Sequence, residues 1–283
     1  MNKLKKVFIA MVSVVLSVVC ALGLTACSKE DIVKAEFNIS IFDTVESQME
    51  DYSLKVDLYG HLAPTTVSAI SKYIKNGYYD NTVFYKLNSY DKQFMIGDLK
   101  YDPEQTENEG FSLNAEMPTV EGEFKHGGTT GSNLQHKRGS IGLWRSWAAQ
   151  DFSYNMGRTG TDSGRATLFM PTDRMQAYDD YFCVFATYDL TDDDNQETIT
   201  ELEYIFGSDD IVYQDFVIYY TGEYGNLTFN CVKKDAFVEK NIENLFKAEE
   251  GSAQLACYNH YTIKVPMTSD GQVAAKITSA KIK

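Results

Sequence analysis

Apolar and polar residues alternate along much of the chain in the way that half-buried strands require. Leu54, Val56 and Leu58 alternate with polar neighbours between Ser53 and Gly60, which predicts a strand. Further strands are predicted at 83–87, 94–96, 139–143, 166–170, 182–188, 215–220, 227–232, 261–265 and 275–282. The polar stretch 100–138 is predicted to form long surface loops. The 19 Tyr and 16 Phe also favour strands over helices.

Three segments show helical spacing instead. The first opens at Pro64, places Val67, Ile70 and Ile74 on one face, and meets a stop at Asn76-Gly77. The other two are predicted at 198–206 and 235–247, with a hairpin turn at 222–225 between them. Many short strands with two or three helices favour a closed β-barrel capped by helices.

The first residues have the features of a secretion signal. Lys3, Lys5 and Lys6 precede an apolar run over 7–24, which leads into Leu24-Thr25-Ala26-Cys27. The ending resembles a bacterial lipobox, in which the Cys27 thiol receives diacylglycerol and becomes the first mature residue. The alternative is an uncleaved transmembrane segment, since eighteen mostly apolar residues just span a bilayer. We expect residues 1–26 to be the signal peptide and Cys27 to hold the protein on the outer face of the cell membrane.

The net charge excludes one class of partner. The formal charge is −14, and removal of residues 1–26 takes away three lysines and no acidic residue, which leaves −17. Such a chain repels phosphate backbones and anionic lipid surfaces. We therefore expect no nucleic acid partner.

The cysteines and histidines do not form a metal-binding pattern. Cys183 sits in an apolar strand pattern and is predicted to be buried, whereas a Cys231–Cys257 disulfide is conceivable but unsupported by spacing alone. His126 and His136 share one loop region without acidic residues at metal spacing. We predict neither a metal nor a cofactor.

An ordered series of motifs indicates a family. The segments of this series follow the order and spacing of that family's motifs: Ala63-Pro64-Thr65-Thr66-Val67, Gly77-Tyr78-Tyr79-Asp80-Asn81-Thr82-Val83-Phe84-Tyr85-Lys86, Phe94-Met95-Ile96-Gly97-Asp98, Arg138-Gly139-Ser140-Ile141-Gly142-Leu143-Trp144-Arg145, Thr167-Leu168-Phe169-Met170 and Tyr178-Asp179-Asp180-Tyr181-Phe182. The series resembles a cyclophilin-type peptidyl-prolyl cis-trans isomerase over 53–188, with a closing strand at 277–282.

The resemblance implies a mainly β fold. We expect a closed, cyclophilin-like eight-stranded β-barrel that is capped by two helices. The domain is predicted to span 53–283, after a short N-terminal segment at 27–52. Residues 189–259 do not fit the family pattern throughout, so the hairpin and third helix there are predicted to form an insertion.

Isomerisation needs an apolar seat for the proline ring and a hydrogen-bond donor for the twisted amide nitrogen. The donor in cyclophilins is an arginine, and the resemblance places Lys86 at its position. Lys86 keeps the positive charge but loses the planar fork. The alternative is an ordinary strand-end lysine in water.

The resemblance also implies substrate-binding residues, each open to an ordinary core role. Phe94, Met95 and Phe169 match the proline pocket. The remaining candidates stand at positions that line the groove: Trp144, Arg145, Thr167, Tyr178 and Phe182. Trp144 replaces a small alanine and is expected to narrow the groove, while Arg145 either contacts substrate or forms a surface salt bridge. The family's backbone-binding glutamine after Phe94-Met95-Ile96 is missing.

These features predict an isomerase of weak activity that acts on proline-containing segments of exported or surface proteins. The alternative is a catalytically inactive peptide-binding or scaffolding lipoprotein on the same barrel. A solute-binding lipoprotein fits the anchor, but the repeated βα units of that architecture are missing.

Overall fold

The fold begins with two long paired strands. The structure is a computed structural model, and it describes residues 32–87, 90–114, 118–125, 129, 131–145, 166–207, 211–221, 228–239 and 260–283. β1 (Ile32–Asp43) and β2 (Gln48–Tyr59) pair antiparallel over their whole length. β1 was not among the predicted strands, although Phe37, Ile39 and Ile41 alternate inward like Leu54 and Val56 of β2. The barrel therefore includes residues that the sequence pattern assigned to the N-terminal segment 27–52.

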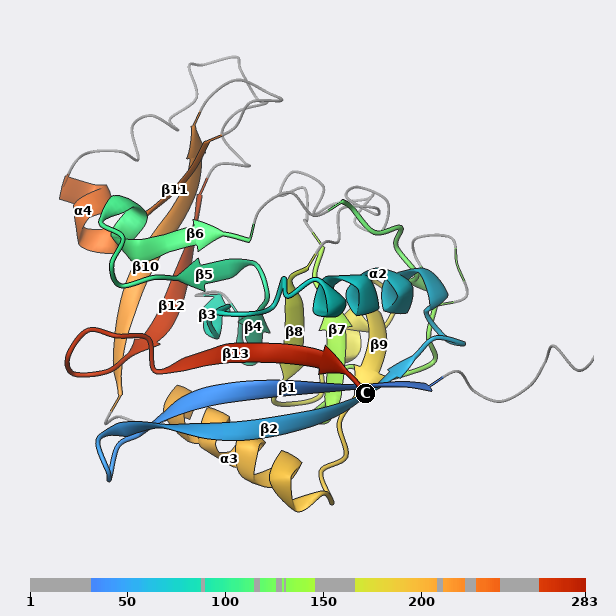
Figure 1. Cartoon of the computed structure of the whole chain (residues 1–283). Coiled ribbons are helices and arrows are strands. Elements are labelled where there is room, and N and C mark those ends of the chain that lie inside the picture. Colours follow the sequence, from blue (N-terminus) through green and yellow to red (C-terminus); the bar gives the residue numbers. More distant parts are fainter. Residues whose placement is uncertain are drawn as a thin grey trace, which may run out of the picture. The chain divides into compact units, whose positions relative to one another are not determined.

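Eight strands form a closed ring (Figure 1). Their order is β3-β4-β8-β7-β9-β2-β1-β13, and the bounds of the remaining six are β3 (Tyr85–Leu87), β4 (Tyr90–Ile96), β7 (Ser140–Leu143), β8 (Leu168–Pro171), β9 (Cys183–Thr187) and β13 (Ala275–Ile282). β13 closes the ring against the residues that lead into β3: the Phe84 N–H donates to Ala275 O at 3.0 Å, and the Ile277 N–H donates to Thr82 O at 2.8 Å. The predicted mainly β fold is confirmed, and these two hydrogen bonds join β13 to the residues that precede β3.

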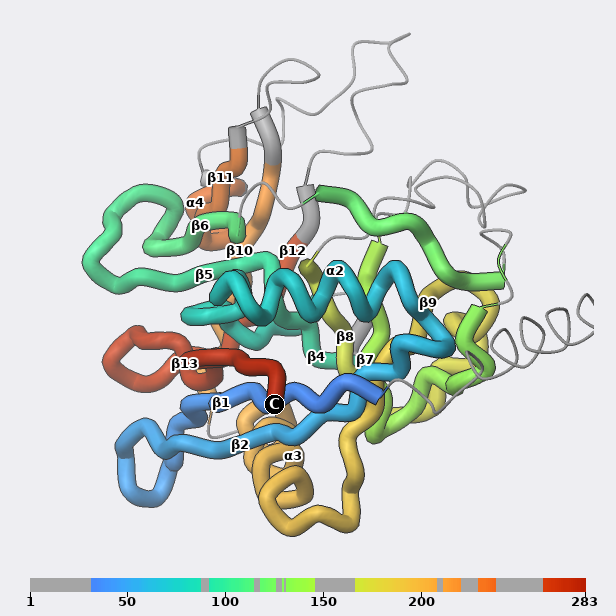
Figure 2. Tube along the Cα trace, turned by 45° about the vertical axis from the view of Figure 1, so that its right-hand side comes forward, coloured from blue at the N-terminus to red at the C-terminus, as the bar shows by residue number. Residues whose placement is uncertain are grey.

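Two helices cover the barrel. α2 (Pro64–Lys75) packs against β13 and β2, and α3 (Asp193–Gly207) packs against β1 and β2 (Figures 1 and 2). Both helices were predicted, with α3 starting earlier than expected. Among the described residues, no helix has the length and apolar content needed to cross a bilayer.

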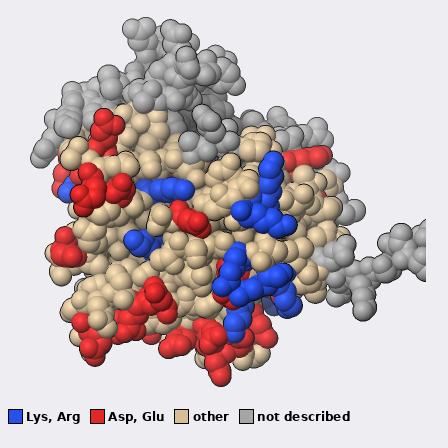
Figure 3. Space-filling model, viewed as in Figure 1, with Lys and Arg blue, Asp and Glu red and all other residues tan. Residues whose placement is uncertain are grey.

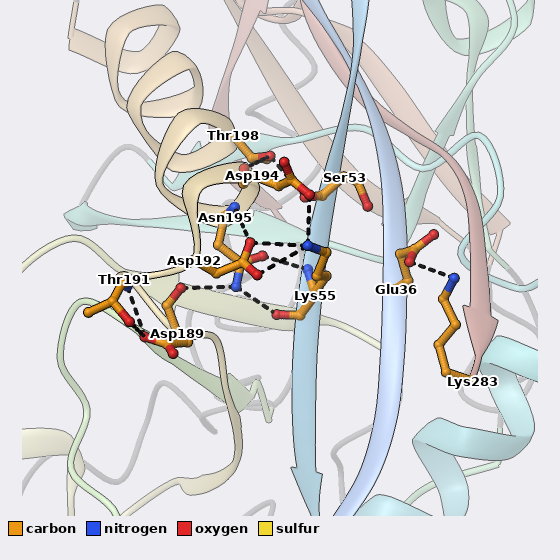
Figure 4. Close-up of polar contacts among 10 residues, drawn as sticks. All are labelled: Glu36, Ser53, Lys55, Asp189, Thr191, Asp192, Asp194, Asn195, Thr198 and Lys283. Atoms are coloured by element: carbon orange, nitrogen blue, oxygen red, sulfur yellow. Dashed lines mark hydrogen bonds and ion pairs between the residues drawn. The ribbon is translucent and has the colours of Figure 1, made fainter.

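Polar contacts fix the start of α3 on β2 (Figure 4). The Asn195 side chain accepts the Lys55 N–H at 2.7 Å and donates to the Lys55 carbonyl at 3.1 Å. The Lys55 ammonium also pairs with Asp192 at 3.1 Å and Asp194 at 2.7 Å. Acidic groups at a helix N-terminus stabilise the helix, because their negative charge lies near its partial positive charge. α3 is thus tied to the barrel, although it lies in the range 189–259 that was predicted to hold an insertion.

The described strands that follow α3 extend the sheet. β10 (Val212–Thr221) pairs with both β11 (Thr228–Lys233) and β12 (His260–Met267), and β12 joins β3 at Ile263 opposite Leu87. α4 (Lys234–Glu239) packs on β10 and β11. The predicted hairpin is present, while its turn at 222–225 and the continuation of the third helix beyond 239 lie outside the described residues.

The stretch predicted as surface loops contains regular structure. β5 (Leu99–Tyr101) and β6 (Phe111–Leu113) form a separate two-stranded sheet. Leu99 and Phe111 bury their side chains beside Phe216 of β10, and the Phe111 and Phe216 ring centroids are 4.7 Å apart. The prediction missed these strands because their apolar partners lie on the extension, far along the chain.

Both described cysteines in the barrel and extension are buried free thiols. Burial raises the pKa of Cys183 and of Cys231 to about 12. Cys183 is in the core, as predicted. Cys231 makes no disulfide in the structure, and Cys257, like Cys27 and His126, lies outside the described residues.

Candidate functional site

Two hydrophobic clusters lie on the two faces of β3, β4 and β8. The main core holds Phe84, Phe94 and Met170. The outer cluster holds Tyr85 and Met95, together with a larger set of buried residues from β8, the loops and the extension that includes Phe169, Tyr178, Phe182, Phe216, Ile218, Ile263 and Val265. Successive residues of a strand point to opposite faces, so this division follows directly from the strand register.

A row of facing residues crosses four strands on the outer face. Tyr85 of β3 stands opposite Met95 of β4, Met95 opposite Phe169 of β8, and Phe169 opposite Gly142 of β7. Met95 and Phe169 are fully buried. A Cβ atom on Gly142 would come within 2.4 Å of the Phe169 ring, so the missing side chain is what gives this ring its place.

Four rings gather around Phe169, and together with it they form what we call the aromatic cluster: His136, Trp144, Phe169, Tyr178 and Phe182. The His136 ring stacks on Phe169 with centroids 5.3 Å apart, and Phe182 meets Phe169 edge-on at 5.4 Å. Trp144, which is only partly buried, stacks on Phe182 at 5.1 Å and covers Phe169 edge-on at 5.8 Å. Edge and stacked contacts of this kind are the favoured geometries of aromatic pairs.

Arg145 lies against this cluster and is almost completely buried. Its Nε–H donates to Tyr181 O at 2.8 Å, and its guanidinium carbon is 4.6 Å from the Phe124 ring centroid and 5.4 Å from that of Phe182. Burial lowers its pKa from the ordinary value. The contacts of Arg145 thus include two aromatic rings and a backbone carbonyl.

A buried histidine fixes the loop that carries Tyr178 and Phe182. Asp179 accepts hydrogen bonds from the His136 backbone at 2.9 Å and from Arg174 Nη1 at 3.0 Å, and its Oδ1 is 3.1 Å from His136 Nδ1. Burial lowers the pKa of His136 to about 4. Burial alone would raise the pKa of Asp179, but hydrogen bonds from Arg174 and His136 outweigh it and lower that pKa. His136 is thus neutral near pH 7, and its buried Nε2 has no hydrogen-bond partner among the described residues.

A carboxylate flanks the row at its other end. The Tyr85 hydroxyl donates to both oxygens of Asp98, at 2.9 and 3.0 Å. The Thr167 side chain also acts to lower the pKa of Asp98, and the Thr167 carbonyl accepts the Trp144 backbone N–H at 2.8 Å. Burial raises the pKa of Asp98 to about 6, against the opposing effect of these hydrogen bonds.

Lys86 and Phe94 lie on the opposite face from the row. The Lys86 ammonium donates to Phe206 O at 3.0 Å, near the C-terminus of α3, and lies 5.4 Å from the Phe206 ring centroid. Phe94 packs on the same ring at 4.8 Å. The structure therefore brings Met95, Trp144, Arg145, Thr167, Phe169, Tyr178 and Phe182 together but does not place Lys86 or Phe94 with them. The reason is that side chains alternate between the two faces of a strand. The motif alignment places Lys86 at the position of the family's arginine, but on β3 it is Tyr85 that points to the outer face.

Four further residues belong to this site and were not singled out: Tyr85, Asp98, His136 and Asp179. Alternation along 83–87 was the available signal for Tyr85, because Val83 and Tyr85 share a face. The remaining three are brought in by loops whose course the pattern of apolar residues does not specify. Among the described residues, no group of three His, Cys, Asp or Glu side chains could hold a metal ion.

Comparison with known families identifies the family to which the barrel belongs. A sequence model described as cyclophilin type peptidyl-prolyl cis-trans isomerase/CLD matches residues 44–187, which is half of the chain. The protein belongs to this family. The match begins at the β1–β2 turn and ends with β9, so it includes Met95, Trp144, Phe169 and Phe182.

Two solved structures are similar to the chain, both of a cyclophilin-type peptidyl-prolyl cis-trans isomerase from Cryptosporidium parvum. One, determined in the presence of the dipeptide Ala-Pro, is 17% identical, with 61% of this chain and 89% of that chain covered and a TM-score of 0.37. The other is 16% identical, with 62% and 88% covered and a TM-score of 0.36. No curated protein matches the chain.

Proposed function

We propose that the protein is a prolyl isomerase whose active face is the aromatic cluster, and that its activity is weak. The observation that carries the proposal is the row Met95–Phe169–Gly142 inside the matched family region, with Trp144 and Phe182 beside it. An apolar, largely desolvated surface of this kind suits a proline ring. The proposed substrates are proline-containing segments of exported or surface proteins.

The chemistry requires no nucleophile. Rotation about the prolyl bond interrupts amide resonance and has a barrier of about 18–20 kcal/mol. The planar amide is more polar than the twisted one, so removal of water by the surrounding rings disfavours the ground state relative to the transition state. A donor aimed at the prolyl nitrogen adds to this, because the nitrogen regains its lone pair only on twisting.

Arg145 is the cation that we assign to this task in place of Lys86. Its guanidinium is held by Tyr181 O and by the Phe124 and Phe182 rings, which fixes its plane beside the cluster. A planar guanidinium offers several N–H donors in a fixed fork, and desolvation strengthens each of them. Arg145→Lys should therefore lose most of the activity, although it keeps the charge.

We propose weak activity because of the position of the Trp144 indole. Its indole contacts Phe169 and Phe182, and both Phe169 and the neighbouring Met95 are fully buried. A proline ring can reach the row only when the indole moves aside, and that displacement uses part of the binding energy.

The test is a Trp144→Ala variant of the full chain, purified in detergent. Exchange NMR of an Ala-Pro peptide should show a several-fold higher kcat/KM than for the wild type, because the indole no longer has to be displaced. Tyr204→Ala, which removes an exposed ring on α3, is the control and should leave kcat/KM unchanged. Absence of acceleration by the wild type and by Trp144→Ala, with both folded, would overturn the isomerase proposal in favour of a binding role.

We propose further that the lipid on Cys27 holds the protein at the outer face of the membrane. The support is the sequence alone: three lysines, an apolar run and the residues Leu24-Thr25-Ala26-Cys27. Metabolic labelling with an alkyne fatty acid should mark the wild type and not Cys27→Ala. Cys20→Ala, which changes a cysteine within the leader, is the matched control and should label normally. Equal labelling of all three would contradict the anchor.

A further inference from the structure

Asp98 is an acidic group with an unusual set of neighbours. Both of its oxygens accept a hydrogen bond from a neutral group, the Tyr85 hydroxyl, at 2.9 and 3.0 Å. Of the ion pairs formed among the described residues, none includes Asp98. A carboxylate in such surroundings keeps an attraction for a cation, which is stronger than in water because the local dielectric constant is low.

The carboxylate lies close to where the proposed substrate would pass. Thr167, whose side chain lies near enough to affect the pKa of Asp98, stands two residues before Phe169, about 7 Å along the extended chain. Tyr85, the hydrogen-bond partner of Asp98, stands next to Met95 in the row. A proline ring seated on Met95 and Phe169 therefore has Asp98 within the reach of a neighbouring lysine or arginine side chain.

The charge of the whole protein acts in the same direction. The formal net charge is −14, and acidic side chains line the lower and left-hand parts of the face in Figure 3, while basic ones gather toward its right-hand side. An excess of one sign attracts ligands of the other and raises their association rate.

We infer that Asp98 selects segments that carry a lysine or arginine next to the proline. This inference rests on the proposed function, since it names the substrate class of the same site. The cationic side chain would pair with the carboxylate while the proline ring lies on the row. An acidic residue at the same place would meet a like charge and bind less well.

The experiment compares peptides that differ only beside the proline. Exchange NMR with the full chain should give Lys-Pro a kcat/KM about tenfold above Ala-Pro, and Glu-Pro a value below Ala-Pro. In Asp98→Asn, which keeps the shape of the side chain, the Lys-to-Glu ratio should fall close to one. Asp57→Asn is the matched control, because it removes the same charge from an exposed ion pair between Asp57 of β2 and Lys34 of β1. It should keep the wild-type ratio.

The outcomes separate this inference from the proposed function. Acceleration of all three peptides to the same extent would overturn the inference and leave the isomerase proposal standing. Equal loss of the ratio in Asp98→Asn and Asp57→Asn would also overturn it, since overall charge rather than Asp98 would then be responsible. No acceleration of any peptide would overturn the proposed function and the inference with it.

Discussion

The two faces of β3 and β4 differ in what they do with adjacent residues of one motif. On the outer face, Tyr85 and Met95 form the row that leads to Phe169. On the inner face, Phe94 packs on Phe206 and Lys86 bonds the Phe206 carbonyl, so both side chains help to hold the end of α3. The comparison teaches that a motif alignment counts residues, whereas the pleat of the strand decides which of them reach a site.

The largest effect that separates the faces is expected from paired phenylalanine variants. Phe169→Leu should lower kcat/KM at least tenfold per folded molecule, because it reshapes the proposed seat of the proline ring. Phe94→Leu replaces an equally buried ring on the inner face and should leave kcat/KM unchanged. Both should lower the free energy of unfolding by about 1–2 kcal/mol. Exchange NMR combined with urea unfolding checks both readouts, and equal loss of activity in the two variants would break the comparison.

Much of the barrel could be predicted, because its strands carry their own periodicity. The alternation of Leu54, Val56 and Leu58 predicts β2. The helical spacing of Val67, Ile70 and Ile74 predicts α2. β1 was missed because its alternation follows the leader and was assigned to the short N-terminal segment 27–52. β5 and β6 were missed because Leu99 and Phe111 are buried by the extension rather than by neighbours in sequence.

The site was only half predictable for a related reason. Met95, Phe169 and Phe182 fall at family positions and lie on the outer face. Lys86 lies on the opposite face, because one position along a strand reverses the face. His136 and Asp98 carried no local signal, since their roles come from Asp179 and Tyr85, which are distant in sequence.

The next effect is on stability, and it comes from the close contact between Gly142 and the Phe169 ring on the outer face. A methyl group there would meet the Phe169 ring at 2.4 Å, so Gly142→Ala should displace the ring and cost about 1–3 kcal/mol of stability. Gly207→Ala is the matched control, because nothing lies within 4 Å of its added carbon. Thermal unfolding should show a lower midpoint for the first variant and not for the second. An unchanged midpoint for Gly142→Ala would contradict the packing described for Phe169.

A pH-dependent effect follows from His136. Its pKa is about 4 in the fold against 6.5 for an ordinary histidine, so the unfolded chain takes up the proton first as pH falls. The stability that neutral His136 contributes is therefore complete above about pH 6.5 and is lost progressively toward pH 4. Asp98 acts oppositely, because its raised pKa of about 6 lets the folded state take up a proton first.

The stability difference between wild type and His136→Phe isolates the histidine. It should shrink by about 1–3 kcal/mol between pH 7 and pH 4, as measured by urea unfolding at each pH. His61→Phe changes an exposed histidine and serves as the control, with a difference that stays small throughout. A difference for His136→Phe that does not change with pH would show that the ring is not held neutral.

The smallest effect on activity is expected at Lys86, and it gives the most direct test of the claim that the outer face is the active one. Lys86→Met removes the ammonium from the Phe206 carbonyl and should cost about 0.3–1 kcal/mol of stability at the end of α3. Exchange NMR of an Ala-Pro peptide should nevertheless give the wild-type kcat/KM per folded molecule, while Phe169→Leu loses it. Loss of acceleration in folded Lys86→Met, with Phe169→Leu still active, would contradict the account and return the catalytic role to the inner face.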